Sequence, residues 1–205
     1  MSKLLKFVTL MGIILTINFQ VAKASSPDDV GNPEQLNWVG VVSVYNTETG
    51  EEKTARIVED SVNVGNYRNL DGEQVVVYDA IIAIPLENQT RESQTTSKEE
   101  AYIKASLTVT YTLGSNNTIK VTNVSGSWTG TIGGMTFKDR RVTCTDGGFH
   151  GLEKLPIYDS FSYNTGWGFV DKVSNAWGGP GATSQATGSI SGMGGSYQIL
   201  LYLSI

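Results

Sequence analysis

Residues 101–113 read AYIKASLTVTYTL, and apolar and polar positions alternate along them without interruption. Successive side chains of a β-strand point to opposite faces, so this stretch predicts a strand with one apolar face. The residues Gly-Ser-Asn-Asn at 114–117 and a return run at 118–122 complete the pattern of a β-hairpin. The hairpin indicates an all-β fold. It leaves the function open, because a sandwich, a glycan-binding module and a membrane-inserting toxin can all use such a hairpin.

Further strand-like segments follow one another along the chain, and no stretch after residue 24 shows helical periodicity. The segment Glu73–Ile84 is the most hydrophobic of them, and we expect a central strand that is buried on both faces and ends at Pro85. The pattern predicts one antiparallel β-sandwich or jelly-roll domain over residues 36–205. The other predicted strands are 36–45, 54–58, 127–137, 140–144 and 196–204.

The N-terminus has the pattern of a secretory signal peptide. Lys3 and Lys6 precede an apolar stretch at 7–19, and Ala22-Lys23-Ala24 is a small-x-small cleavage site. A transmembrane anchor is the alternative, but polar residues interrupt the stretch and it falls short of the ~20 apolar residues that a spanning helix needs. We therefore expect residues 1–24 to be removed after Ala24, residues 25–35 to form a flexible polar lead-in, and the protein to be secreted without a stable membrane anchor.

The charge limits the kinds of partner that the protein can bind, and the cysteine content indicates how the fold is stabilised. The full chain has 15 basic and 20 acidic residues, and removal of Lys3, Lys6 and Lys23 leaves 12 basic against 20 acidic, a net charge of −8. An acidic surface disfavours nucleic acid and anionic membranes as partners. The single cysteine, Cys144, cannot form an intramolecular disulfide, so stability is expected to come from an apolar core.

Aromatic residues are concentrated between Phe149 and Trp177 and are interleaved with glycines. Exposed rings can stack on the C–H face of a sugar, so this region is a candidate binding platform. The alternative is that the rings fill the core of a glycine-rich β fold. The candidate binding residues are Tyr158, Tyr163, Trp167 and Trp177. The expected partner is a glycan or a protein at the cell surface or in the environment.

Catalytic chemistry is the less favoured interpretation. Cys144 and His150 lie six residues apart, but no cysteine-hydrolase signature surrounds them, and we expect Cys144 to be a buried thiol. A glycosidase would need two facing carboxylates, for which Asp79, Asp159 and Asp171 are the candidates, with Asp79 expected to be buried. One histidine and one cysteine cannot form a zinc site, so no metal or other cofactor is expected, although calcium near Asp146 stays open.

A pore-forming role is a second alternative, because a membrane-spanning strand needs ~9–11 alternating residues and the 101–113 stretch meets this length. The return strand, however, changes its apolar phase at Asn123–Val124, which predicts a β-bulge and favours a soluble sheet. The texture resembles small exported proteins of Gram-positive bacteria, and this resemblance assigns no role to any residue. The sequence thus favours a non-catalytic extracellular binding module over a secreted glycan-active hydrolase or a pore former.

Overall fold

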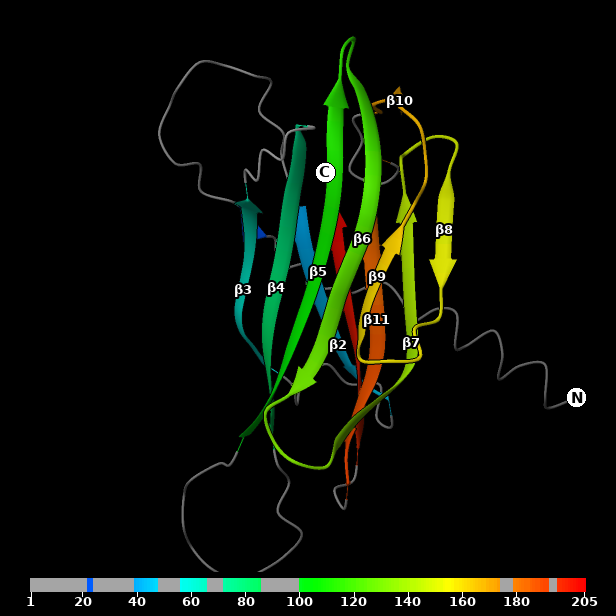
Figure 1. The fold of residues 1–205 in the computed structure, drawn as a ribbon. Helices are drawn as coiled ribbons and strands as arrows, with labels where there is room; N and C mark the ends of the chain where they lie inside the picture. The colour runs from blue at the N-terminus through cyan, green and yellow to red at the C-terminus, as the bar shows by residue number, and fades with distance from the viewer. Residues whose placement is uncertain are drawn as a thin grey trace, which may run out of the picture.

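The computed structural model describes residues 22–23, 39–47, 56–65, 72–85, 100–173, 179–191 and 195–205. These residues form strands and connecting loops without a helix, in two antiparallel sheets (Figure 1). The all-β class predicted from the sequence is therefore confirmed. The predicted signal peptide 1–24 and lead-in 25–35 lie outside the described residues, except that Ala22–Lys23 pair with Val39 and Gly40.

The first sheet, called sheet A here, has the strand order β1-β2-β12-β11-β7-β8. Its strands are β1 (Ala22–Lys23), β2 (Val39–Asn46), β12 (Ser196–Ser204), β11 (Gly181–Ile190), β7 (Met135–Thr145) and β8 (Gly151–Lys154).

The second sheet, sheet B, has the order β10-β6-β5-β4-β3, and β9 also pairs with β6. Its strands are β10 (Val170–Asp171), β6 (Thr118–Gly130), β5 (Glu100–Gly114), β4 (Glu73–Pro85), β3 (Arg56–Gly65) and β9 (Ser160–Asn164). Consecutive strands from β3 to β6 are neighbours, so this part of the sheet is a simple meander.

The alternating stretch that indicated the fold forms β5 and faces the core. Its apolar positions are fully or almost fully buried as far as Tyr111, while Leu113, near the hairpin tip, is 39% exposed. The buried positions of β5 are Ala101, Ile103, Ala105, Leu107, Val109 and Tyr111. The predicted hairpin is thus confirmed, with an apolar face that ends one position early.

The predicted register break in β6 is also present. Thr110 pairs with Asn123 while Tyr111 pairs with Val121, so Thr122 is the extra residue of a β-bulge. The extra residue shifts the alternation by one position, and Val121 and Val124 are both buried as a result. The bulge therefore keeps the apolar residues of both halves of β6 on the core side.

The structure corrects two of the expected strands. In β4 only one face is fully buried, and Asp79, expected to be inside, is exposed because it alternates with the buried Tyr78 and Ala80. The predicted strand 127–137 spans the turn between β6 and β7, since the two apolar ends of this segment belong to different strands. The predicted strand 196–204 coincides with β12 and is paired on both sides, by β11 and β2.

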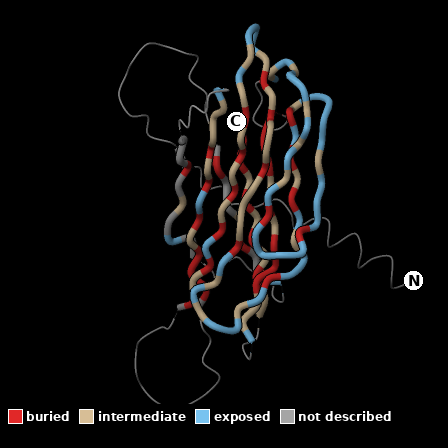
Figure 2. Tube along the Cα trace, viewed as in Figure 1, coloured by how far each residue is buried: buried red, intermediate tan, exposed pale blue. Residues whose placement is uncertain are grey.

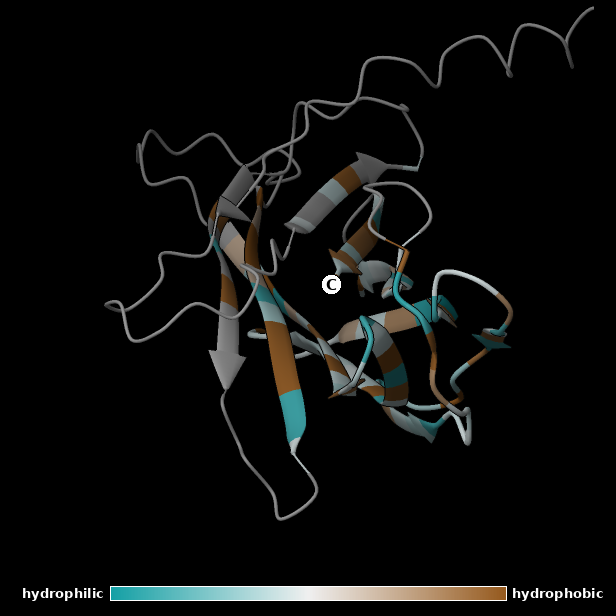
Figure 3. Ribbon diagram, turned by 90° about the horizontal axis from the view of Figure 1, so that it is seen from above, coloured by the Kyte–Doolittle hydropathy of each residue, from teal (hydrophilic) through white to brown (hydrophobic). Residues whose placement is uncertain are grey.

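The two sheets pack face to face around one core. Leu107 of β5 and Leu201 of β12 belong to the same buried cluster, although they come from different sheets. A Cβ on Gly40 would stand 2.5 Å from the Tyr78 ring, so glycine is required where β2 of sheet A passes over β4 of sheet B. Figure 2 shows buried and exposed positions alternating along the strands, and Figure 3 shows the matching bands of hydropathy.

Candidate functional site

The four candidate binding residues have different environments. Tyr158, in the loop between β8 and β9, is 76% exposed. Tyr163 is half-buried in β9 and stacks on Phe161, with ring centroids 5.9 Å apart. Trp167 is half-buried in the loop between β9 and β10 and packs against the core. Trp177 lies outside the described residues. Ligand binding by these rings stays a prediction.

Asp146 organises the turn between β7 and β8. Its side chain is fully buried, and Oδ1 accepts hydrogen bonds from the backbone N–H groups of Gly148, Phe149 and His150 at 3.0–3.1 Å. Oδ2 lies 2.5 Å from Nδ1 of His150. Burial alone would raise the pKa of Asp146, but the donors on Oδ1 and Oδ2 outweigh it and hold the pKa below its usual value. The carboxylate is therefore ionised at neutral pH.

His150 connects this turn to the neighbouring sheet. Its ring stacks on Trp167 with centroids 5.5 Å apart and an interplanar angle of 18°. Thr165 holds the loop that carries Trp167. Its N–H donates to the carbonyl oxygen of Thr122, the extra residue of the β6 bulge, at 3.0 Å. The Asp146–His150–Trp167 contacts thus join a loop of sheet A to a loop of sheet B.

A buried aspartate on Nδ1 of a histidine is the arrangement that orients a general base. The nearest thiol in sequence, Cys144, does not fit the role of a nucleophile. Its pKa is raised to about 12, because burial and the charge of Asp146, which both raise the pKa, outweigh a backbone hydrogen bond of Thr145, which lowers it. Cys144 is therefore a neutral thiol in the core, which confirms the expectation that it is buried.

A run of exposed apolar residues lies on either side of β8. Phe149, Leu155, Ile157 and Tyr158 are 86%, 71%, 82% and 76% exposed. We call these four residues the apolar flanks of β8. Sequence reasoning included the two aromatic residues in its candidate region but missed Leu155 and Ile157, because isolated aliphatic residues next to Pro156 give no periodic signal.

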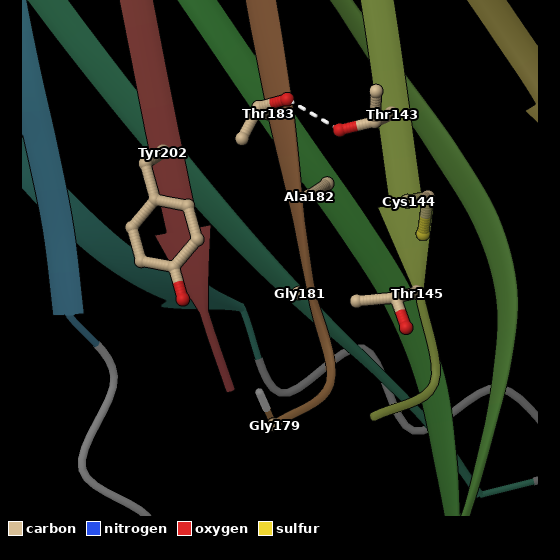
Figure 4. Close-up of a pocket in the computed structure, with 8 residues that line it drawn as sticks. All are labelled: Thr143, Cys144, Thr145, Gly179, Gly181, Ala182, Thr183 and Tyr202. Carbon is tan, nitrogen blue, oxygen red and sulfur yellow. Dashed lines mark hydrogen bonds between the residues drawn. The ribbon is translucent and has the colours of Figure 1, made fainter. Parts of the chain in front are cut away.

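Sheet A carries a pocket of about 160 Å³ on the face that turns away from the core (Figure 4). Two cross-strand rows form it. Thr143, Thr183 and Tyr202 are register partners in one row, and Thr145 pairs with Gly181 in the next. Gly181 has no side chain, and a Cβ there would stand 2.5 Å from Leu203 O of β12. The hollow lies between Tyr202 on one side and the two β7 threonines on the other, as Figure 4 shows.

The polar groups of the pocket are hydroxyls. Thr143 Oγ1 and Thr183 Oγ1 lie 2.5 Å apart and share a hydrogen bond. Thr145 Oγ1 accepts a hydrogen bond from Gly147 N at 3.0 Å, which leaves its own proton for another acceptor. Sequence reasoning missed this site, since outward-facing threonines and tyrosines are ordinary in strands.

The carboxylates considered for glycoside hydrolysis are not gathered around this pocket. Asp159 is paired with Arg140 (Nε to Oδ1 2.8 Å), in the loop that leads into β9. Asp171 lies in β10 of sheet B, and Asp79 lies in β4. Across the described ranges, no group of three or more His, Cys, Asp or Glu residues is placed to hold a metal ion. None of the described segments is a helix long and apolar enough to cross a bilayer.

Comparisons of the chain with protein-family models, with curated proteins and with solved structures found no match. A function for this chain is therefore inferred from its own residues.

Proposed function

We propose that this protein is a secreted, non-catalytic β-sandwich module that binds a neutral saccharide in the pocket on the outer face of sheet A. Secretion follows from the N-terminal signal-peptide pattern, with cleavage after Ala24. The observation that carries the binding role is the combination of one aromatic ring, Tyr202, with the hydroxyls of three threonines around a glycine floor.

This combination suits the chemistry of a sugar. The apolar face of a sugar ring packs against an aromatic side chain, while its hydroxyls exchange hydrogen bonds with hydroxyl groups that both donate and accept. Thr183 supplies such a group on β11, which pairs with the strand of Tyr202, and Thr143 and Thr145 supply two more on β7, the next strand along. Strand pairing fixes their positions, so little ordering entropy is lost on binding.

The size and the charge of the pocket define the ligand further. A pocket of about 160 Å³ is smaller than the ~300–1,000 Å³ of sites for drug-sized molecules, so it suits one sugar ring of a longer chain. None of its eight lining residues is an acid or a base that is charged at neutral pH. The net charge of −8 after removal of the leader disfavours anionic polysaccharides.

The test is retention of the protein on insoluble neutral polysaccharides built from glucose, N-acetylglucosamine, mannose or xylose. We expect retention on at least one of them. The double variant Thr143→Val/Thr183→Val keeps the β-branched shape and removes two hydroxyls, so it should weaken this retention at least tenfold, about 1.4 kcal/mol. The matched control is Thr108→Val/Thr110→Val, two half-buried threonines of β5 in sheet B, which should leave retention unchanged.

The aromatic residues predicted from the sequence provide the competing site. Among the candidate rings that the structure describes, Tyr158 is the most exposed, and Tyr158→Ala removes it without changing the pocket. Retention that is lost in Tyr158→Ala but kept in the double threonine variant would place the ligand on the loops and refute the pocket.

A further inference from the structure

β8 is the last strand of sheet A, and among the described strands it pairs only with β7 (Figure 1). Asp146 N donates to His150 O at 3.4 Å, so the backbone groups of residues 150, 152 and 154 point toward β7 by the alternation of an antiparallel ladder. The N–H and C=O groups of Gly151 and Glu153 point the other way. β8 therefore presents a short row of backbone donors and acceptors at its outer edge.

Natural sheets protect such edges by making them short and charged. The four-residue length of β8 and its Glu153-Lys154 pair fit that pattern. The apolar flanks of β8 do not fit it, because a guarded edge would not place four large apolar side chains, each more than 70% exposed, beside its open backbone groups. The combination is typical of an edge that receives another strand.

We infer that the occupant of this edge is a second copy of the same chain, which adds its own β8 in antiparallel orientation across a two-fold axis. The resulting contact is isologous, so each copy contributes both the backbone groups and the apolar flanks.

The charges and the apolar flanks of β8 together select the register of the two strands. A two-fold axis perpendicular to the sheet places one residue opposite itself, and within β8 that residue can be any of 151–154. Centring on residue 151 would place Leu155 opposite residue 147 of the second copy, so the apolar flanks would not meet. Centring on Glu153 or Lys154 would put two like charges directly opposite each other, which is destabilising. Centring on Leu152 avoids both, and on both sides of the axis it brings Leu155, which directly follows β8, next to the turn of the second copy that carries Phe149.

The register centred on Leu152 also suits the outward backbone groups of β8 and the side chains of Glu153. Gly151 comes opposite Glu153 of the second copy, and both residues point their backbone groups outward, as a hydrogen-bonded pair requires. The two Glu153 side chains then stand on a diagonal. Each is already paired with Arg141 of its own chain, with Nε to Oε1 at 2.9 Å. Their mutual repulsion is therefore reduced.

The dimer has a consequence for binding. A two-fold axis perpendicular to the sheet joins the two copies of sheet A and turns both outer faces to the same side. Each pocket has one wall on β7, the neighbour of β8, so the two pockets lie on one continuous surface. A polymer that reaches both gains an avidity of about 10²–10⁴ over a single site. The dimer itself does not depend on the saccharide proposal.

The test is sedimentation equilibrium of the purified chain over a range of concentrations. We expect a reversible dimer. Glu153→Pro removes an outward N–H while keeping the β7 pairing, and Leu155→Asp removes the apolar side chain next to the turn that carries Phe149. Each should raise the dimer dissociation constant at least tenfold, and far-UV circular dichroism shows that the variants are folded. If Glu153→Pro fails to fold, Leu155→Asp alone tests whether the edge of β8 forms the dimer.

The matched control is Val58→Asp in β3, the edge strand of sheet B. The side chain of Val58 is 43% exposed. This variant should sediment as the dimer. A wild-type chain that is monomeric throughout, a dimer that survives Leu155→Asp, or a dimer lost in Val58→Asp would each overturn the inference. The pocket variant Thr143→Val/Thr183→Val should stay dimeric, so loss of saccharide retention and loss of self-association are read out separately.

Discussion

The imidazole of His150 stacks on the indole of Trp167, with ring centroids 5.5 Å apart, and this contact links the two sheets at the edge where β8 and β9 lie. The stack is positioned from both sides. Asp146 holds Nδ1 of His150 at 2.5 Å, and Thr165 ties the Trp167 loop to the β6 bulge. The edge that we assign to self-association is therefore held by specific contacts and not by strand pairing alone.

Replacement of Trp167 by alanine should destabilise the domain without unfolding it. The half-buried ring loses its contacts with the core and with His150, so the cost should be below the about 3–5 kcal/mol measured for fully buried aromatic residues. Trp167→Phe keeps a ring and should recover part of the loss. Chemical denaturation measures both variants, and an unchanged unfolding free energy for Trp167→Ala would contradict the structural role of the stack.

Asp146 should make the stability depend on pH in the acid range. Its pKa is lowered in the folded state, so its contribution is fully present above the unfolded pKa of about 3.9 and is lost as the pH falls through the lower folded value. Asp146→Asn should cost about 1–3 kcal/mol at neutral pH and flatten this acid dependence. Urea unfolding between neutral and acid pH tests the prediction; a wild type and a variant with parallel pH profiles would refute it.

Cys144 should make the stability depend on pH in the alkaline range. Its folded pKa is raised to about 12, against about 8.5 for an unfolded thiol. The buried neutral thiol therefore contributes fully below the unfolded pKa, and this contribution declines as the pH rises toward the folded value. Cys144→Ala should remove the part of the alkaline decline that begins near the unfolded thiol pKa, while the pKa of Tyr78, which burial raises, leaves a decline at higher pH. In the native wild type the thiol should resist iodoacetamide until the chain is unfolded, and rapid alkylation of the folded protein would show that it is accessible.

The tip of the β5–β6 hairpin should be sensitive to β-branched substitution. Asn116 has φ of 59°, a left-handed conformation that asparagine and glycine tolerate and valine does not. We expect Asn116→Val to lose about 1–2 kcal/mol and the exposed Asn116→Gly to stay within about 0.5 kcal/mol of the wild type. Thermal unfolding compares the two, and equal losses in both variants would point to a side-chain contact and not to the backbone conformation.

The β5–β6 hairpin was predictable from sequence because one buried face imposes strict alternation, which is a local signal. The bulge at Thr122 was predictable for the same reason, since an extra residue shifts the phase of the apolar positions. Asp79 shows the limit of this reasoning. A run of apolar residues indicates a central strand, but which face of the strand is covered depends on the partner sheet, which the run does not contain.

The candidate site was less predictable. The pocket of sheet A unites Thr143 and Thr183 with Tyr202, and these residues meet only through the pairing of β7, β11 and β12. No local pattern marks such a row. The aromatic content between Phe149 and Trp177 is visible in the sequence, but the sequence cannot separate Tyr158, which is exposed, from Phe161, which is in the core. Exposure there depends on loop paths between the two sheets.

Amide chemical-shift mapping is the sharpest test of saccharide binding on the outer face of sheet A. The labelled protein is titrated with neutral oligosaccharides of glucose, N-acetylglucosamine, mannose or xylose. We predict saturable shifts for the amides of Thr143, Thr145, Gly181 and Thr183 with at least one of them, and none of these shifts in the Thr143→Val/Thr183→Val variant. Shifts confined to sheet B or to the loop around Tyr158, or no saturable shift with any of the four oligosaccharides, would refute saccharide binding on this face.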